Sequence, residues 1–385
     1  MNRRFALAAL ATFTFTALAA TAAKPAVAQT YRVTDLGSLS GASASSVSKV
    51  NDKGSVLGRS SFTTKGISTN KHWLWTPDVE NGTTGGPPQE FMPLAGFGGA
   101  KAHDINNAGL MVGGSHVSDS NLNGVAVYYI SPNAPVKIND LERDTAADPS
   151  LAGWFFNVAI AVSDPDATTG AFYVFGDGYY EGSAKVTIVW RMAPGTTAGT
   201  YKIISVVPQN PIGSLRALNF YGQGVGVSNS QATLWNGNTG QGTSLGYLPG
   251  GTYSRAWDIN DLGNVVGESP TTATGDNRGF FWTPTTPNGT VGTMTALGTL
   301  GGQSSALAIN ASNQVVGYSY LKGDRVQHAC RFASSGAAQD LNSLKSAGAT
   351  GLELLKANAI NRGGSIVGIF NTTKGGGAYL LTPLP

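Results

Sequence analysis

One eight-residue cassette recurs along most of the sequence. It reads Asn, two variable residues, Gly, one variable residue, an apolar pair and a second Gly. Copies begin at Asn51, Asn106, Asn219, Asn260, Asn310 and Asn361. Self-similarity at intervals of roughly 40 to 50 residues is the signature of a repeat architecture. The chain is therefore expected to fold as an array of similar units.

The cassette predicts a tight turn between two strands. Asn at the first turn position hydrogen-bonds its own backbone, and Gly three residues later supplies the positive φ that closes the hairpin. In the copy that begins at Asn310, this Gly is replaced by Asn313, and Asn is the non-glycine residue that best tolerates the left-handed region. The second Gly predicts a place where the strand passes very close to its neighbour.

Four strand-like segments recur in the same order around each turn. An apolar segment ends in Ile-Asn, a second ends at the apolar pair and Gly, a third carries aromatic residues, and a short fourth follows. Four strands per unit is the arrangement of a β-propeller blade. Tryptophans recur in the third segment, which predicts packing between blades rather than ligand stacking; they are Trp73, Trp75, Trp190, Trp235 and Trp282.

The spacing of the second Gly sets the number of units. It falls at Gly58, Gly113, Gly226, Gly267, Gly317 and Gly368. The interval from Gly113 to Gly226 is about twice the usual one, so we expect a degenerate unit within it, near residues 159–190. Residues 31–39 resemble a fourth strand and residues 377–383 a third. We therefore predict an all-β, seven-bladed propeller closed by pairing of the N-terminal strand with the last blade; a six- or eight-bladed ring and an open array are the alternatives.

One unit carries a family resemblance. The string Leu297-Gly298-Thr299-Leu300-Gly301-Gly302, followed by Ser305-Ala306, Ile309-Asn310 and Val315-Val316-Gly317, resembles the HAF family of extracellular repeats. The family's His-Ala-Phe triplet reads His328-Ala329-Cys330 here. The resemblance is weak across residues 144–240. It implies secretion and a repeat fold, and it brings no catalytic residue with it.

The first 28 residues are typical of a secretory signal peptide. A basic start with Arg3 and Arg4 precedes an uncharged apolar run, and a small-x-small cleavage site precedes Gln29. A membrane anchor is the alternative reading. We expect a secreted or periplasmic protein whose residues 29–385 form a single propeller domain. With Cys330 as the sole cysteine, no internal disulfide can form, and we expect a monomer.

The charge balance excludes some partner classes. Removing Arg3, Arg4 and Lys24 from the 25 basic residues leaves 22, equal to the 22 acidic residues. A chain without net charge has no general field to attract phosphate backbones, so nucleic acid is not an expected partner. An extracellular polysaccharide or another cell-surface ligand is the partner that we expect.

The loops from fourth to first strands and the strand starts beside them carry the candidate ligand-binding residues. Propellers commonly bind ligands at one mouth of the central channel, so these side chains could hold a sugar or uronic acid, although an ordinary solvated rim explains them too. They are Lys101, His103, Tyr253, Arg255, Gln303 and Glu353, with Lys356 beside them.

Among the four histidines, His103 is the best candidate for a general base, with Lys101 and Arg255 as possible partners. Asp104 and Asp258 occupy equivalent positions in two units, which indicates a structural role. His72 and His328 fall in equivalent third strands and are expected to pack in the core. The sequence thus predicts a possible acid–base site without a diagnostic spacing.

Signatures of cofactor and metal enzymes are missing from the sequence. It has no Gly-x-Ser-x-Gly elbow, no His-Glu-x-x-His and no phosphate-binding Gly-Lys-Ser/Thr loop. Residues 119–124 match the first half of a calcium loop, but Ile130 stands where a bidentate Glu would close it. We therefore predict neither a metal nor a cofactor.

Three functions fit these observations. The first is an exported propeller that binds a ligand, by preference a carbohydrate, at or outside the cell surface, because the remaining chain is uncharged and rich in aromatic and amide side chains. The second is a polysaccharide lyase or glycoside hydrolase that uses His103 with Lys101, Tyr253 or Arg255. The third is a structural or adhesive repeat protein.

Overall fold

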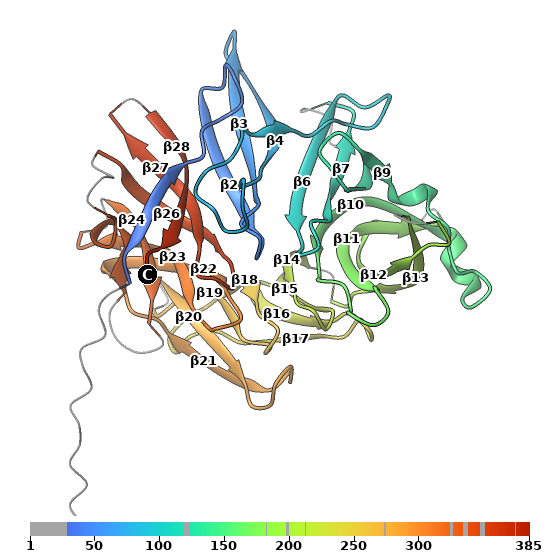
Figure 1. Ribbon diagram of the computed structural model, residues 1–385. Coiled ribbons are helices and arrows are strands. Elements are labelled where there is room, and N and C mark those ends of the chain that lie inside the picture. Colours follow the sequence, from blue (N-terminus) through green and yellow to red (C-terminus); the bar gives the residue numbers. More distant parts are fainter. Residues whose placement is uncertain are drawn as a thin grey trace, which may run out of the picture.

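Seven antiparallel four-stranded sheets stand around a common centre in the computed structural model (Figure 1). The structure describes residues 29–118, 124–181, 183–197, 200–211, 213–272, 275–323, 326–333, 338–346, 351–373 and 375–385. The predicted signal peptide and residues 119–123 of the calcium-loop match lie outside them. The first strand of each sheet lines the centre and packs against the first strands of both neighbours. The arrangement is that of a closed seven-bladed β-propeller, as predicted.

Each blade runs outward from its first strand. Blades 1 to 3 are β2 (Ala44–Val50), β3 (Val56–Thr64), β4 (Ile67–Trp75), β5 (Gln89–Glu90); β6 (Gly99–Ile105), β7 (Met111–His116), β8 (Gly124–Tyr129), β9 (Pro135–Lys137); and β10 (Trp154–Val162), β11 (Phe172–Tyr180), β12 (Val186–Pro194), β13 (Tyr201–Pro208). Blades 4 and 5 are β14 (Ser214–Leu218), β15 (Gln223–Ser228), β16 (Gln231–Asn236), β17 (Gly242–Ser244); and β18 (Arg255–Ile259), β19 (Val265–Pro270), β20 (Asn277–Pro284), β21 (Gly292–Ala296). Blade 6 is β22 (Gly301–Ile309), β23 (Val315–Leu321), β24 (Gln327–Phe332) and β25 (Gln339–Asp340). Short 3₁₀ turns are η1 (Ile138–Asp140), η2 (Pro149–Gly153) and η3 (Leu341–Ser343).

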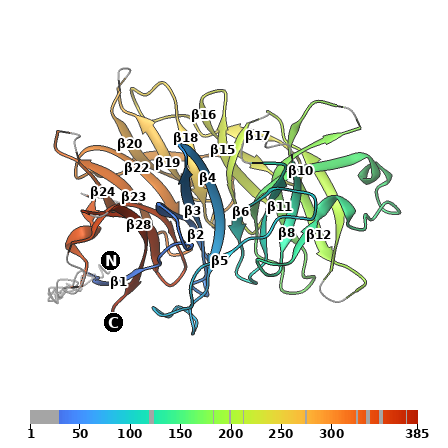
Figure 2. The same cartoon turned by 90° about the horizontal axis from the view of Figure 1, so that it is seen from above.

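Both ends of the described chain contribute to the seventh blade. It consists of β26 (Glu353–Ile360), β27 (Ile366–Thr372), β28 (Gly375–Pro383) and, as the outermost strand, β1 (Tyr31–Asp35). β1 runs antiparallel to β28, from Tyr31 opposite Pro383 to Asp35 opposite Tyr379, so the blue and red ends of the chain lie side by side (Figure 2). The N-terminal strand thus closes the ring, as the sequence predicted. Blade 3 is the degenerate unit.

The turn chemistry matches the prediction. Asn51 Oδ1 accepts hydrogen bonds from the backbone N–H groups of Lys53, at 3.1 Å, and Ser55, at 2.9 Å. Gly54 has φ +84° and Asn313 has φ +59°. Asn and the left-handed residue therefore close these hairpins locally.

The second glycine of the cassette is required by a bulge. All seven first strands carry a register shift at the same place, shortly before the turn. In blade 6 a Cβ on Gly317 would collide with the backbone carbonyl of Ser305 and approach the amide of Leu307. The bulge in turn increases the local twist of the hairpin that faces the channel.

The space between blades is filled by third-strand aromatics. Trp73, Trp190 and Trp235 are fully buried, while Trp75 and Trp282 are 4% and 2% exposed. They lie on β4, β12, β16 and β20, which confirms that these tryptophans are core residues. None of the helical segments in the described part of the chain is long and apolar enough to cross a membrane.

We expect Gly317→Ala to destabilise the fold by roughly 1–3 kcal/mol, because the new methyl group meets rigid backbone rather than a movable side chain. Gly86→Ala is the matched control, since a Cβ at Gly86 meets nothing within 4 Å. Urea denaturation of both variants measures the difference. Equal stability of the two would show that the bulge does not require glycine.

Candidate functional site

A central channel runs through the ring and is lined by residues of all seven blades. It encloses about 600 Å³ of space. One end is formed by the turns between first and second strands, which we call the turn end. The other end lies where the first strands begin, which we call the channel mouth.

At the turn end, the cassette asparagines join the blades to one another. We call this set the asparagine belt. In each case the side-chain Nδ2 donates to the backbone carbonyl at the equivalent position of the next blade. The bonds run from Asn219 to Asn260 (3.2 Å), Asn260 to Asn310 (3.1 Å), Asn310 to Asn361 (2.9 Å), Asn361 to Asn51 (3.1 Å), Asn51 to Asn106 (3.1 Å) and Asn106 to Ser163 (3.0 Å).

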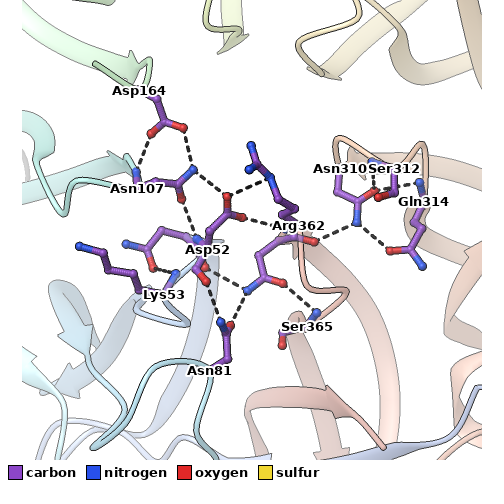
Figure 3. Close-up of polar contacts among 12 residues, drawn as sticks. Asp52, Lys53, Asn81, Asn107, Asp164, Asn310, Ser312, Gln314, Arg362 and Ser365 are labelled. Atoms are coloured by element: carbon purple, nitrogen blue, oxygen red, sulfur yellow. Dashed lines mark hydrogen bonds and ion pairs between the residues drawn. The ribbon is translucent and has the colours of Figure 1, made fainter. Parts of the chain in front are cut away.

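Each belt amide serves two blades at once. While Nδ2 donates to the next blade, Oδ1 accepts from the backbone N–H four residues later in its own turn. Asn310 Oδ1 thus accepts from the Gln314 N–H at 3.0 Å, and Asn361 Oδ1 accepts from the Ser365 N–H at 2.9 Å (Figure 3). Blade 3 has Ser163 in place of Asn, and its hydroxyl donates to the carbonyl of Asp164. The belt therefore spans six consecutive junctions, including the one between blades 7 and 1.

Carboxylates and amides surround the belt. Asn107 Nδ2 donates to Asp52 Oδ2 at 2.8 Å and to Asp164 Oδ2 at 2.6 Å, while Asp52 Oδ1 accepts from the Arg362 N–H at 2.8 Å (Figure 3). Burial raises the pKa of Asp164, hydrogen bonds from Asn107 oppose this, and the negative charges of Asp52 and Asp261 add to it. Among the described residues, no group of three His, Cys, Asp or Glu side chains could hold a metal ion.

Asn361→Asp keeps the Oδ1 acceptor and removes the two Nδ2 donor bonds, to Asn51 O and Asn81 Oδ1. The new carboxylate would be buried against these oxygens, so we expect a loss of about 3 kcal/mol at neutral pH. The folded state would raise the pKa of this carboxyl. The loss should therefore shrink as the pH falls, because the protonated acid can donate again.

The measurement is urea denaturation at neutral and at mildly acidic pH. Asn238→Asp is the matched control, because Asn238 is exposed and its side-chain oxygen only accepts, from the Tyr173 hydroxyl. If Asn361→Asp behaved like this control at both pH values, the belt would not join the blades.

Halfway along the channel, one lysine faces two aspartates. Lys49 Nζ lies 3.6 Å from Asp104 Oδ1. Burial alone would lower the pKa of Lys49, but the charges of Asp104 and Asp258 outweigh this and raise it. The second oxygen of each aspartate accepts a backbone N–H of the next blade, from Val162 and Ile309, both at 3.0 Å. These bonds give Asp104 and Asp258 the structural role predicted for them.

The channel mouth carries a polar arc on blades 4 to 7. We define the mouth arc as the cavity-lining residues Arg216, Trp257, Glu268, Tyr318 and Lys356. The Arg216 guanidinium lies 4.9 Å from the Trp257 ring centre, and Lys356 Nζ lies 5.6 Å from that of Tyr318. These are cation–π distances between neighbouring blades.

One buried carboxylate balances part of this charge. Glu268 is 4% exposed, and its Oε1 accepts a 3.0 Å ion-pair hydrogen bond from Arg255, whose guanidinium also lies 5.2 Å from the Tyr253 ring centre. Burial lowers the pKa of Lys356, and Glu268 opposes this. Burial, together with the charge of Glu268, raises the pKa of Tyr318 to about 12, so its hydroxyl remains a donor. With Arg255 included, the arc and its immediate surroundings carry three cations and one carboxylate.

The structure separates the residues selected from the sequence. Tyr253 and Arg255 lie beside the mouth arc, and Lys356 is part of it. The other four are distributed over three blades: Lys101 and His103 on blade 2, Gln303 on blade 6 and Glu353 on blade 7. None of the six predicted binding residues is among those that line the channel cavity. Their role in binding stays a prediction.

Two histidines lie between blades 1 and 2. The ring centres of His72 and His103 are 6.2 Å apart, and His72 Nδ1 lies 3.0 Å from the carbonyl of Ala102. Burial lowers the pKa of His72 to about 3, with His103, Arg59 and Lys101 adding to the effect. Burial and then Lys101 and His116 lower that of His103 to about 4. Both imidazoles are therefore neutral at neutral pH, and His103 is a weak base there.

The remaining predicted core histidine bridges two blades instead. His328 Nδ1 lies 2.6 Å from Asp340 Oδ2, and its Nε2 lies 3.3 Å from Glu353 Oε1 on blade 7. Glu353 is thus engaged with blade 6.

Acid should weaken the fold through His72 and His103. Their pKa values are lower in the folded than in the unfolded chain, where 6.5 applies, so the unfolded state binds more protons below that pH. The contribution of the two neutral histidines to the free energy of unfolding is complete above about pH 6.5. It should fall by about 1.4 kcal/mol per pH unit per histidine toward pH 4.

Urea denaturation across this pH range is the measurement, with His103→Gln compared with the unchanged protein. The variant should lose less stability between pH 6.5 and 4 than the unchanged protein. Parallel curves would contradict the assignment of acid sensitivity to this inter-blade contact.

Sequence reasoning missed four of the five mouth-arc residues. Trp257 follows the repeated Ala256, and Arg216 follows the equivalent Leu215; Glu268 and Tyr318 each directly follow the second glycine of their cassette. The available signal was therefore positional: each of the four directly follows either the repeated apolar residue of a first strand or the second glycine of a cassette.

No family model matches the chain, and no curated protein matches it. Among solved structures, the acylaminoacyl peptidase of Pyrococcus horikoshii aligns with a TM-score of 0.50 at 10% identity, covering 89% of this chain and 52% of that one. The chain thus spans about half the length of that protein. The α-L-arabinofuranosidase of Podospora anserina, in complex with cellotriose, aligns at 8% identity over 93% and 97% of the two chains, with a TM-score of 0.29. At 10% identity the likeness to the peptidase shows the fold alone.

Proposed function

We propose that this protein is an exported β-propeller that binds an acidic polysaccharide at its channel mouth. The observation that carries the proposal is the mouth arc, in which Arg216 and Lys356 each lie over an aromatic ring and the single carboxylate, Glu268, is already paired with Arg255 beside the arc. Guanidinium groups recognise carboxylates through paired hydrogen bonds. A uronic acid residue offers both such a carboxylate and a sugar ring with apolar C–H faces.

The cations are held in place before a ligand arrives. Arg216 rests on Trp257 and Lys356 on Tyr318, while Arg255 is held by Glu268 and Tyr253. The first strands that carry them are fixed by the asparagine belt at the opposite end. Preorganised charges lose less conformational entropy on binding. Export, which the N-terminal sequence predicts, would bring this mouth to polysaccharides at or outside the cell surface.

Affinity electrophoresis in gels containing polygalacturonate, alginate or a neutral galactomannan tests the proposal. We expect retardation by an acidic polymer and not by the neutral one, and weaker retardation at high salt. Lys356→Gln and Trp257→Ala should each weaken binding by roughly tenfold, equivalent to about 1.4 kcal/mol. Lys65→Gln is the matched control, because Lys65 is exposed at the β3–β4 hairpin.

Other outcomes would overturn the proposal. Retardation by neither acidic polymer would favour a structural or adhesive role. New reducing ends or unsaturated products released from the same polymers would favour a hydrolase or lyase. Equal binding by Lys356→Gln and Lys65→Gln would place the site elsewhere.

A further inference from the structure

A second hollow lies away from the channel, between blades 2 and 3. It encloses about 270 Å³. Its walls come from the start of β8 and the end of β9 in blade 2, and from the start of β10 and the end of β11 in blade 3. This places it on the same face of the ring as the channel mouth. We call it the inter-blade groove.

One wall of the groove is an aromatic pair. Phe155 and Tyr179 stand opposite each other on β10 and β11, with ring centres 5.1 Å apart and planes inclined by 13°. Phe155 is 43% exposed despite its size. Tyr179 stacks on one face of the Phe155 ring, and both residues line the groove. A large aromatic surface exposed inside a hollow is characteristic of binding sites rather than of ordinary surface.

Polar groups face the same space. Asn157 lines the groove, and no hydrogen bond joins its side chain to another described residue. Lys137 and Asp140, on the blade 2 side, form a 2.9 Å ion pair. The groove thus combines an apolar wall with the Asn157 side chain and an ion pair.

The wall is held rigidly by the connection between the two blades. Asn139 Nδ2 donates to the carbonyl of Phe156 at 2.9 Å, and Asn139 Oδ1 accepts from the Phe156 N–H at 2.8 Å. Arg143 also lines the groove, and its guanidinium donates to the carbonyls of Leu151 and Ala152 at 2.9 and 2.7 Å. The backbone that carries Phe155 and Asn157 is therefore fixed in the absence of a ligand.

We propose that the inter-blade groove binds a neutral pyranose residue of a glycan. The apolar face of the sugar ring would continue the stack on Phe155, and its hydroxyl groups would bond to the Asn157 amide and to the Lys137–Asp140 pair. The volume lies just below the roughly 300–1,000 Å³ typical of drug-sized ligands, which suits a single sugar ring. Lys137 is paired with Asp140, and the Arg143 guanidinium already donates to backbone carbonyls, so both cations of the groove are engaged and an uncharged ligand is favoured, in contrast to the mouth arc. The site is independent of the channel mouth.

Saturation-transfer NMR tests this with methyl glycosides of glucose, galactose, mannose and N-acetylglucosamine as probes. We expect transfer to the ring protons of at least one glycoside, and its loss in both Phe155→Ala and Asn157→Ala. Tyr247→Ala is the matched control, because Tyr247 is another aromatic residue that is 46% exposed. Lys356→Gln, which tests the channel mouth, should leave the signal unchanged.

The outcomes separate the two proposals. Transfer to none of the glycosides, or transfer that persists in both groove variants, would overturn the groove site whatever the acidic polymers do. Loss of the signal in Lys356→Gln with retention in Phe155→Ala would move the neutral sugar to the channel mouth. Thermal melting verifies that each variant is folded, and Asn157→Ala decides the question should Phe155→Ala unfold.

Discussion

The side-chain amide of the turn asparagine is the contact on which the ring depends. Its oxygen closes the turn of one blade and its nitrogen holds the backbone of the next, as Asn310 does between Gln314 and Asn361. A buried amide is satisfied only when donor and acceptor are both engaged. The residue therefore fixes the hairpin and the blade-to-blade register together, and because Asn361 reaches Asn51, the same contact joins the last blade to the first.

Rigidity at the turn end leaves the channel mouth free to vary. The bulge, the repeated small residues and the second glycine place the first two strands of every blade in the same position. In several blades the side chain directly after the repeated apolar residue of the first strand, or after the second glycine, then faces the channel. Arg216, Trp257, Glu268 and Tyr318 occupy such positions on blades 4 to 6. A recognition surface can thus change by single substitutions without altering the ring.

The architecture was predictable because the backbone conformation of the repeated turn requires Asn and Gly at the same positions in most units. Asn51, Gly54 and the glycine after the apolar pair identify the turn and the close approach of neighbouring strands, and residues 31–39 identify the closing strand. The cross-blade role of Nδ2 was not predicted, since a local turn already accounts for the asparagine. The mouth arc was missed because each of its residues occurs in one unit only, and its convergence depends on the ring. A residue that the sequence selected can also lie away from the expected site: Glu353 stands at the start of a first strand, but its carboxylate contacts His328 on the adjacent blade.

Hydrogen–deuterium exchange of the intact protein, followed peptide by peptide, tests the central claim most directly. The backbone amides that donate to the belt, from Ser55 and Leu110 to Gln314 and Ser365, report on each junction separately. A closed ring held by the belt predicts similarly slow exchange at the six asparagine turns, with the turns at residues 51–55 and 361–365 as protected as the others. Rapid exchange confined to those two turns would show that the ring is open between blades 7 and 1 and would contradict the account.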